Sequence, residues 1–166
     1  MANRIGIISD THLTSSSDTF KGLVDLAFQN CSLIIHAGDI TDVGVLDAFS
    51  GKTLYAVHGN MCSQPVKKRF PESRSVIIDG YTIAVCHGAG MGTSIEEGLF
   101  DRFFDADCII YGHTHQPVNH RVGNILFINP GSFAGTGHFG SPGTYATLET
   151  SENGLTATLH SLPRSK

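Results

Sequence analysis

Two histidines separated by one residue follow a short apolar run near the middle of the chain. The run Cys108–Tyr111 leads through Gly112 into His113-Thr114-His115. A run of this length predicts a buried strand, and both imidazoles then lie on the loop at its end. Other polar residues follow apolar runs in the same way, at Asp10-Thr11-His12, Gly38-Asp39, Gly59-Asn60 and His87-Gly88. Together the five segments predict a metal site.

Seven side chains are the candidate metal ligands. Oxygen and imidazole donors without a thiolate suit Mn, Fe, Co, Ni or Zn better than Ca, and imidazole argues against Mg alone. Glycines beside several of these residues let the backbone turn at positive φ and approach an ion closely. The candidates are Asp10, His12, Asp39, Asn60, His87, His113 and His115.

The number and charge of these ligands favour two ions. Seven ligands exceed what one tetrahedral centre needs. Asp10 and Asp39 supply two negative charges, so two divalent ions with a bridging hydroxide leave a net charge of about +1, which attracts a phosphate. A carboxylate such as Asp39 can bridge ions about 3.5–4 Å apart. Each motif alone is an ordinary turn or a structural histidine, whereas five at strand ends favour the metal site.

The apolar pattern predicts strands and helices that position these residues. We expect an α/β front half, because strands alternate there with a helix over 19–30 and a short helix over 42–49 capped by Asp42. We expect antiparallel hairpins and one helix over 94–104, started by a Ser94/Glu97 capping box, in the second half. The segment after Asn60 is expected to be a loop. The strands are expected at 5–8, 32–36, 53–57, 76–78, 81–85, 108–111, 118–122, 125–128, 144–150 and 155–160.

The composition limits the domain organisation, the ligands and the location that we expect for the chain. The 166 residues predict a single domain, 1–166, and a formal net charge of −4 gives no basic surface for nucleic acid. No apolar run is long enough to span a membrane, and the first residues lead directly into a strand, so we expect no signal peptide. Four cysteines without a CxxC pair suit a reducing cytoplasm.

The ordered motifs Asp-x-His, Gly-Asp, Gly-Asn, His-Gly and Gly-His-Thr-His resemble those of the calcineurin-like metallophosphoesterases. The short chain and Asn129-Pro130-Gly131-Ser132 are similar to the small YfcE-like phosphodiesterase branch, which includes Vps29. The resemblance implies a four-layer α/β/β/α sandwich and, by analogy with small relatives that pair, a homodimer. It also implies one ion held by Asp10, His12, Asp39 and His115, and a second held by Asp39 as the bridge with Asn60, His87 and His113.

The implied reaction is hydrolysis of a small phosphate ester, most simply a phosphodiester. A metal-bridging hydroxide attacks phosphorus in line, with Mn as the first expectation for the ions. Asp39, Asn60 and His87 are the expected catalytic residues, and Asn60 and His87 also position the substrate phosphate. Nucleotides, cyclic nucleotides, phospholipid head groups and phosphoproteins all remain open as substrates.

The third motif departs from the family pattern. The family continues Gly-Asn-His-Asp/Glu or Gly-Asn-Cys-Asp, whereas this chain reads Gly59-Asn60-Met61-Cys62. Met61 cannot protonate a leaving alkoxide, and loss of a general acid costs about 10²–10⁴-fold. We therefore expect a rearranged loop and a preference for leaving groups that need little acid assistance. His138, in a glycine-rich loop, is a further candidate for the missing acid.

Three alternatives stay open. A non-catalytic Vps29-like scaffold explains the altered third motif, whereas the complete ligand set favours an enzyme. Amidohydrolases also use His-x-His, but at the first strand of an eightfold barrel. The metallo-β-lactamase pattern needs Asp and His directly after His-x-His, where Gln116-Pro117 stands. Among other residues, His36 and His58 are expected to support the site without binding metal, and Lys67-Lys68-Arg69 to be a solvated charge run.

Overall fold

The computed structural model describes residues 3–135 and 141–164, so His138 lies outside the described residues. The helices are α1 (Asp18–Phe28), the 3₁₀ helix η1 (Val43–Phe49), α2 (Gln64–Arg69) and α3 (Ile95–Arg102). The strands are β1 (Asn3–Ile8), β2 (Leu33–His36), β3 (Thr53–Ala56), β4 (Ser73–Ile78), β5 (Tyr81–Cys86), β6 (Cys108–Tyr111), β7 (Val118–Val122), β8 (Ile125–Asn129), β9 (Thr144–Ser151) and β10 (Gly154–Ser161).

The strands form two five-stranded mixed sheets. The first has the order β10-β9-β1-β2-β3, and the second has the order β4-β5-β6-β8-β7. In the first sheet β1, β2 and β3 are parallel, and in the second β5, β6 and β8 are parallel. The remaining strands are antiparallel hairpin partners. The carboxyl ends of each parallel set therefore meet at one edge, where loops can deliver side chains to a common site.

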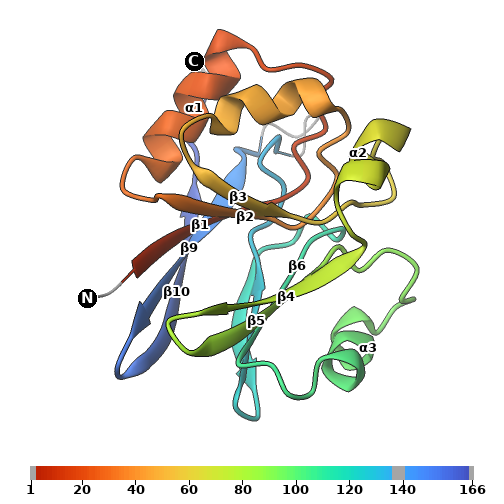
Figure 1. The fold of residues 1–166 in the computed structure, drawn as a ribbon, viewed down its shortest axis with the longest axis vertical. Coiled ribbons are helices and arrows are strands. Elements are labelled where there is room, and N and C mark those ends of the chain that lie inside the picture. The colour runs from red at the N-terminus through yellow and green to blue at the C-terminus, as the bar shows by residue number, and fades with distance from the viewer. Residues whose placement is uncertain (1–2, 136–140, 165–166) are drawn as a thin grey trace.

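The two sheets pack face to face, and helices cover their outer faces (Figure 1). Isoleucines such as Ile7 and Ile110 fill the layer between the sheets. On the outer face of the first sheet, Phe28 of α1 and Phe49 of η1 are buried. On the outer face of the second sheet, Leu99 of α3 is buried. The predicted α/β/β/α sandwich is confirmed.

Three local predictions need correction. Gln64–Arg69 forms α2 rather than a loop, because Pro65 occupies the first turn, where its missing N–H costs nothing. The helix capped by Asp42 is a 3₁₀ helix. Ser94 precedes α3 but its side chain makes no capping hydrogen bond, so the predicted capping box does not form. Among the described residues, no helix has the length and apolar character needed to cross a bilayer.

Candidate metal centre

The predicted ligands come from loops at the carboxyl ends of strands in both sheets. Asp10 and His12 follow β1, Asp39 follows β2 and Asn60 follows β3. From the second sheet, His87 follows β5, while His113 and His115 follow β6. The face-to-face packing brings the two sets together at the seam between the sheets. The first sheet thus supplies the carboxylates and the amide, and the second sheet supplies imidazoles alone.

Asp10 lies deepest in the centre and is fully buried. Its Oδ2 accepts hydrogen bonds from the Ser9 hydroxyl and from the backbone N–H of His113. Its Oδ1 faces the Nε2 atoms of His115, at 3.2 Å, and His12, at 3.5 Å. Those two Nε2 atoms are themselves 3.2 Å apart. One oxygen and two imidazole nitrogens therefore converge on a single point, as in a metal-binding cluster.

A second cluster forms around Asp39 and His87. His87 Nδ1 donates to the Ala37 carbonyl, at 2.8 Å, which fixes the ring. Its Nε2 then faces only oxygen acceptors, at 3.2 Å from Asp39 Oδ2 and 3.1 Å from Asn60 Oδ1. Because acceptors surround this nitrogen, a cation must lie among them: a proton or a metal ion.

The charges at this second cluster reinforce one another. Burial opposes ionisation of Asp39, but the hydrogen bond and charge of His87 outweigh it and lower the pKa of the Asp39 carboxyl. Burial likewise opposes charging of His87, yet the hydrogen bond to Asp39 and the Asp10 charge raise the pKa of the His87 imidazole. The protein therefore holds positive charge between the two carboxylates, the condition that a metal ion also meets.

Two observations test whether the residues fit metal ions. Donor atoms of Asp10, Asp39 and His87 lie within 4.8 Å of one another, and Asp10 and Asp39 are only 0% and 2% exposed. Among the described residues, no lysine or arginine pairs with either carboxylate, and only histidines lie within ion-pair distance. Buried carboxylates require compensating charge, so the donor set fits divalent cations.

The backbone of the centre is strained at the ligands. Non-glycine residues rarely adopt positive φ, and doing so costs on the order of 1–3 kcal/mol where the surrounding structure enforces it. Such strain concentrates at functional sites, and here it falls on the ligand-bearing loops. The ligands with φ between 48° and 70° are Asp10, His12, Asp39, His113 and His115.

The glycines beside the ligands are required by close packing. A Cβ on Gly59 would lie 2.1 Å from Asp39 Oδ1, and one on Gly112 would lie 2.2 Å from the Ser9 hydroxyl oxygen. Neither position can hold a side chain without displacing a carboxylate or the group that orients it.

The predicted ligands do not all make equivalent contacts. Asn60 contacts the second cluster through its Oδ1, although the residue is exposed. His113 is also exposed, and its ring packs edge-on against that of His87, with centroids 5.3 Å apart. It belongs to neither three-residue cluster of donor atoms. The structure thus gathers the seven residues in one place, but His113 approaches the centre through its backbone N–H and through ring packing, without placing a ring nitrogen in either cluster.

Three supporting residues were not singled out as functional from the sequence. The Ser132 hydroxyl donates to the Asp10 carbonyl, at 2.9 Å, and Ser9 braces the Asp10 carboxylate. Asn129 Nδ2 donates to the carbonyl of Gly112 and to the hydroxyl of Thr114, each at 3.0 Å, and so supports the His-x-His loop. The only sequence signal was the Asn-Pro-Gly-Ser segment itself.

His36 and His58 lie beside the centre without entering its donor clusters. His36 is fully buried, and its Nδ1 accepts from the N–H of Gly38. Burial, aided by the nearby His87 charge, lowers the pKa of His36 to about 3, so the ring is neutral. It therefore supports the loop that carries Asp39, as a residue behind the ligands does.

The altered third motif has its own contacts. The Met61 N–H donates to Asp39 Oδ1, at 2.8 Å, while its side chain is 58% exposed. Cys62 is buried, and its Sγ accepts from the N–H of Gly59, at 3.1 Å. The cysteine thus closes the turn, and the loop after β3 keeps the Asp39 contact without offering an acid group from Met61.

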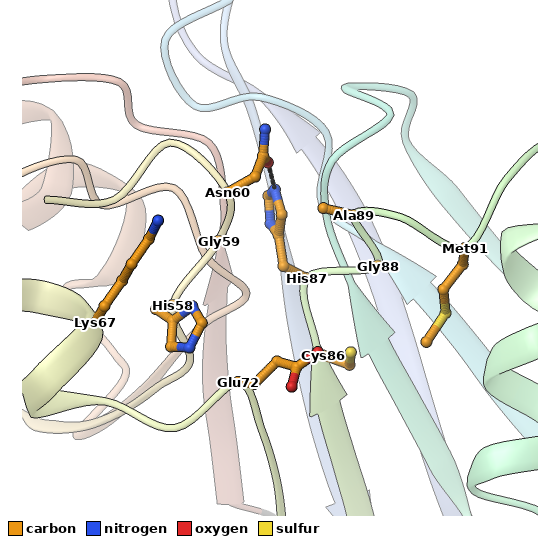
Figure 2. A pocket seen from close by; sticks show the side chains of 10 residues that line it. All are labelled: His58, Gly59, Asn60, Lys67, Glu72, Cys86, His87, Gly88, Ala89 and Met91. Carbon is orange, nitrogen blue, oxygen red and sulfur yellow. Dashed lines mark hydrogen bonds between the residues drawn. The ribbon is translucent and has the colours of Figure 1, made fainter. Parts of the chain in front are cut away.

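A cavity of about 230 Å³ adjoins the second cluster (Figure 2). Asn60 and His87 reach into it from the metal centre, and residues from the loop after β3, from α2, from the segment before β4, from the end of β5 and from the loop after β5 complete its walls. The lining residues are His58, Gly59, Asn60, Lys67, Glu72, Cys86, His87, Gly88, Ala89 and Met91. The centre is therefore open to a small ligand on its Asn60 side.

The chain resembles solved structures over nearly its whole length. An archaeal phosphodiesterase is 26% identical with a TM-score of 0.71, and the match covers 95% of this chain and 99% of that one. Vps29 of Entamoeba histolytica, solved with zinc, is 20% identical with a TM-score of 0.74 over 95% of this chain and 92% of that one, a likeness of fold.

Sequence relatives carry the same indication. A probable metallophosphoesterase of Methanocaldococcus jannaschii is 36% identical over 132 residues, which cover 77% of this chain and 67% of the relative. A phosphodiesterase of the same organism is 29% identical over 148 residues, or 80% and 85% of the two chains. The model of the calcineurin-like phosphoesterase superfamily domain matches residues 4–153. Sequence, fold and the clustered donors agree, and this chain belongs to the calcineurin-like phosphoesterase superfamily.

Proposed function

We propose that the protein is a phosphodiesterase that works with two divalent metal ions. Asp10, His12, Asp39 and His115 hold one ion. Asp39 bridges to the other, which Asn60, His87 and His113 hold. Manganese is the first candidate, and nickel, iron, cobalt and zinc suit the same mixture of oxygen and imidazole donors.

The observation that carries this proposal is the pair of adjoining donor clusters with two buried carboxylates. Asp10 belongs to both clusters, and Asp39 Oδ2 lies between them, 3.2 Å from His87 Nε2 and 3.9 Å from His12 Nε2, which supports Asp39 as the bridge. Neither carboxylate has a lysine or arginine partner among the residues that the structure describes. Two such anions buried side by side need compensating positive charge, which divalent ions between them would supply.

The chain's own residues then position the substrate. When bound, the ions supply a hydroxide for in-line attack on phosphorus and neutralise the non-bridging oxygens. Asn60 offers its amide to a phosphate oxygen from the exposed side of the second cluster. His87, fixed by the Ala37 carbonyl, keeps its orientation throughout. Asp10 and Asp39 supply the carboxylates that hold the centre together.

Because Met61 cannot donate a proton, the leaving group must depart with little acid assistance. Aryl phosphodiesters meet this condition, and simple alkyl diesters do not. We therefore expect bis(4-nitrophenyl) phosphate to be hydrolysed much faster than a dialkyl phosphate.

The decisive experiment removes metal with a chelator, adds back Mn²⁺ or Ni²⁺, and measures hydrolysis of bis(4-nitrophenyl) phosphate. Activity should return with metal, and Asp39→Ala should lower it by at least about 10³-fold, because it removes the bridging ligand. Asp47→Ala, which removes an exposed carboxylate on η1, is the matched control and should keep the full rate. An Asp39→Ala protein with full metal-dependent activity would refute the two-ion proposal.

A non-catalytic scaffold is the second candidate, and the observation that favours it is the altered Met61-Cys62 segment. Metal stoichiometry separates the two. The enzyme should bind about two ions per chain with Mn²⁺ in excess, as a two-metal site requires. Binding of fewer than one ion, together with no hydrolysis, would favour the scaffold.

A further inference from the structure

The cavity beside the second cluster has two dissimilar walls. Lys67 of α2 stands on one side of Asn60 and His87, and Ala89 and Met91 stand on the other (Figure 2). One wall therefore offers a cation, and the other offers apolar contact. A phosphate seated on Asn60 and His87 would have this space directly beside it.

Lys67 differs from its two basic neighbours. Its side chain is half-buried, whereas Lys68 and Arg69 are exposed. Arg69 already lies over the Phe70 ring, 5.6 Å from its centroid. Within the described part of the chain, Lys67 makes no ion pair. The expected solvated charge run thus resolves into one residue that faces the cavity and two that face solvent.

The acidic residue in the cavity wall does not neutralise Lys67. Glu72 Oε1 pairs with Arg102 Nη1 at 4.0 Å, and its side chain is 71% exposed. Its charge is therefore shared with another cation and largely hydrated. Lys67 is left as the cation that faces the cavity, and a lysine in a cavity wall favours an anionic ligand.

The size of the cavity limits the ligand. Its volume of about 230 Å³ is below the roughly 300–1,000 Å³ of pockets that enclose drug-sized molecules. It suits a phosphate at Asn60 and His87 that carries a few carbon atoms and one charged group facing Lys67.

We propose that the substrate carries a second anionic group, a carboxylate or a phosphate, on a short aliphatic arm attached to the reacting phosphate, and that Lys67 binds this group. The inference rests on the proposed function, because it places the reacting phosphate on Asn60 and His87. It makes Lys67 a specificity-determining residue of this chain.

The test measures binding to the Mn²⁺-loaded protein by calorimetry with probes that cannot be hydrolysed. Propylphosphonate carries the phosphate mimic and an apolar arm. The other two probes, 3-phosphonopropionate and propane-1,3-diphosphonate, add a carboxylate or a second phosphonate. We expect at least one of the two probes with a second anionic group to bind about 5- to 20-fold more tightly than propylphosphonate, as a charge-assisted hydrogen bond allows. The preferred probe identifies the anion.

Substitutions assign this preference to Lys67. Lys67→Met should reduce it to about twofold or less, and Lys67→Arg should retain most of it, because the charge remains. Lys68→Met, one position along the same helix and exposed, is the matched control and should preserve the preference. Loss in Lys67→Met with retention in Lys67→Arg also excludes general damage to α2.

The outcomes separate this inference from the proposed function. If propylphosphonate binds but neither probe with a second anionic group binds more tightly, the Lys67 inference is wrong and the metal centre stands. A preference that survives in Lys67→Met likewise overturns the role of Lys67 and leaves the metal centre intact. If no probe binds, both proposals fail, because the reacting phosphate then has no binding site at Asn60 and His87.

Discussion

The two sides of the metal centre differ in how firmly the fold holds them. On the carboxylate side, Asp10 and Asp39 are buried and lie on left-handed backbone. On the side of the loop after β3, Asn60 is exposed and the Met61 side chain is 58% exposed. Packing and hydrogen bonds fix the conformation of the carboxylate side, whereas the loop after β3 is open to substrate. The comparison indicates that metal binding is built into the core and that substrate preference is set by the loop.

The largest effect should come from forcing the two sides apart. Gly59→Ala places a Cβ 2.1 Å from Asp39 Oδ1, so the bridging carboxylate or the loop must move. We expect a loss of metal affinity of at least about 100-fold, more than loss of a supporting residue causes. Titration with Mn²⁺ measures this.

The matched control for that prediction is Gly22→Ala. Gly22 lies on an exposed face of α1 with no atom within 4 Å of the added Cβ, so this change should leave metal affinity intact and stabilise the helix by about 0.5–1 kcal/mol. Equal metal affinity in both variants would show that the close packing at Gly59 is unimportant.

A smaller effect should follow from loosening the His-x-His loop, whose His113 N–H donates to the Asp10 carboxylate. Asn129→Ala removes two hydrogen bonds to the His-x-His loop, at Gly112 and Thr114. We expect metal affinity to fall about 10-fold, the lower end of the range for residues behind metal ligands. Metal titration and hydrolysis of an aryl diester check this, and an unchanged affinity would mean that the loop needs no brace.

A substitution that should add activity in the loop after β3, the side open to substrate, also tests the comparison. Met61→His restores an imidazole next to Asn60, and the exposed side chain has room for it. We expect hydrolysis of alkyl diesters to rise about 10-fold, less than an ideally placed acid provides, and that of aryl diesters to change little. A similar rise for both substrates would show that the imidazole does not act as an acid.

The last effect is on stability and concerns the packing behind Asp39. Burial holds the pKa of His36 at about 3 in the folded protein, so between its ordinary pKa and pH 3 only the unfolded chain takes up the proton. Stability should therefore fall as pH falls through this window, by at most about 1.4 kcal/mol per pH unit for this one group.

Urea unfolding at pH 7, 6, 5 and 4, with a chelator present, measures that slope. His36→Asn keeps an acceptor for the Gly38 N–H but cannot titrate, so its stability should depend less on pH. Identical slopes for the two proteins would contradict the assignment, since the carboxylates contribute equally to both.

Local chemistry explains which elements were predictable. The hairpin that joins β4 and β5 was predictable, because Asp79 and Gly80 both adopt the positive φ that this two-residue turn requires. Helix α2 was missed because Pro65 and three basic residues do not resemble an amphipathic pattern. The candidate ligands were visible because each follows an apolar run. The bond from Ser132 to Asp10 spans 122 positions, so no local pattern reveals it.

The centre draws its donors from loops of both sheets, so bound ions would link the two sheets across the layer of isoleucines between them. Neither sheet alone provides the full set of donors. Cations would therefore bind to, and stabilise, only the molecule in which the two sheets are packed together. Metal affinity should therefore depend on how well the two sheets pack against each other. A cavity created at Ile7 or Ile110, which lie in the layer between the sheets and are not ligands, would then lower the affinity for the ions.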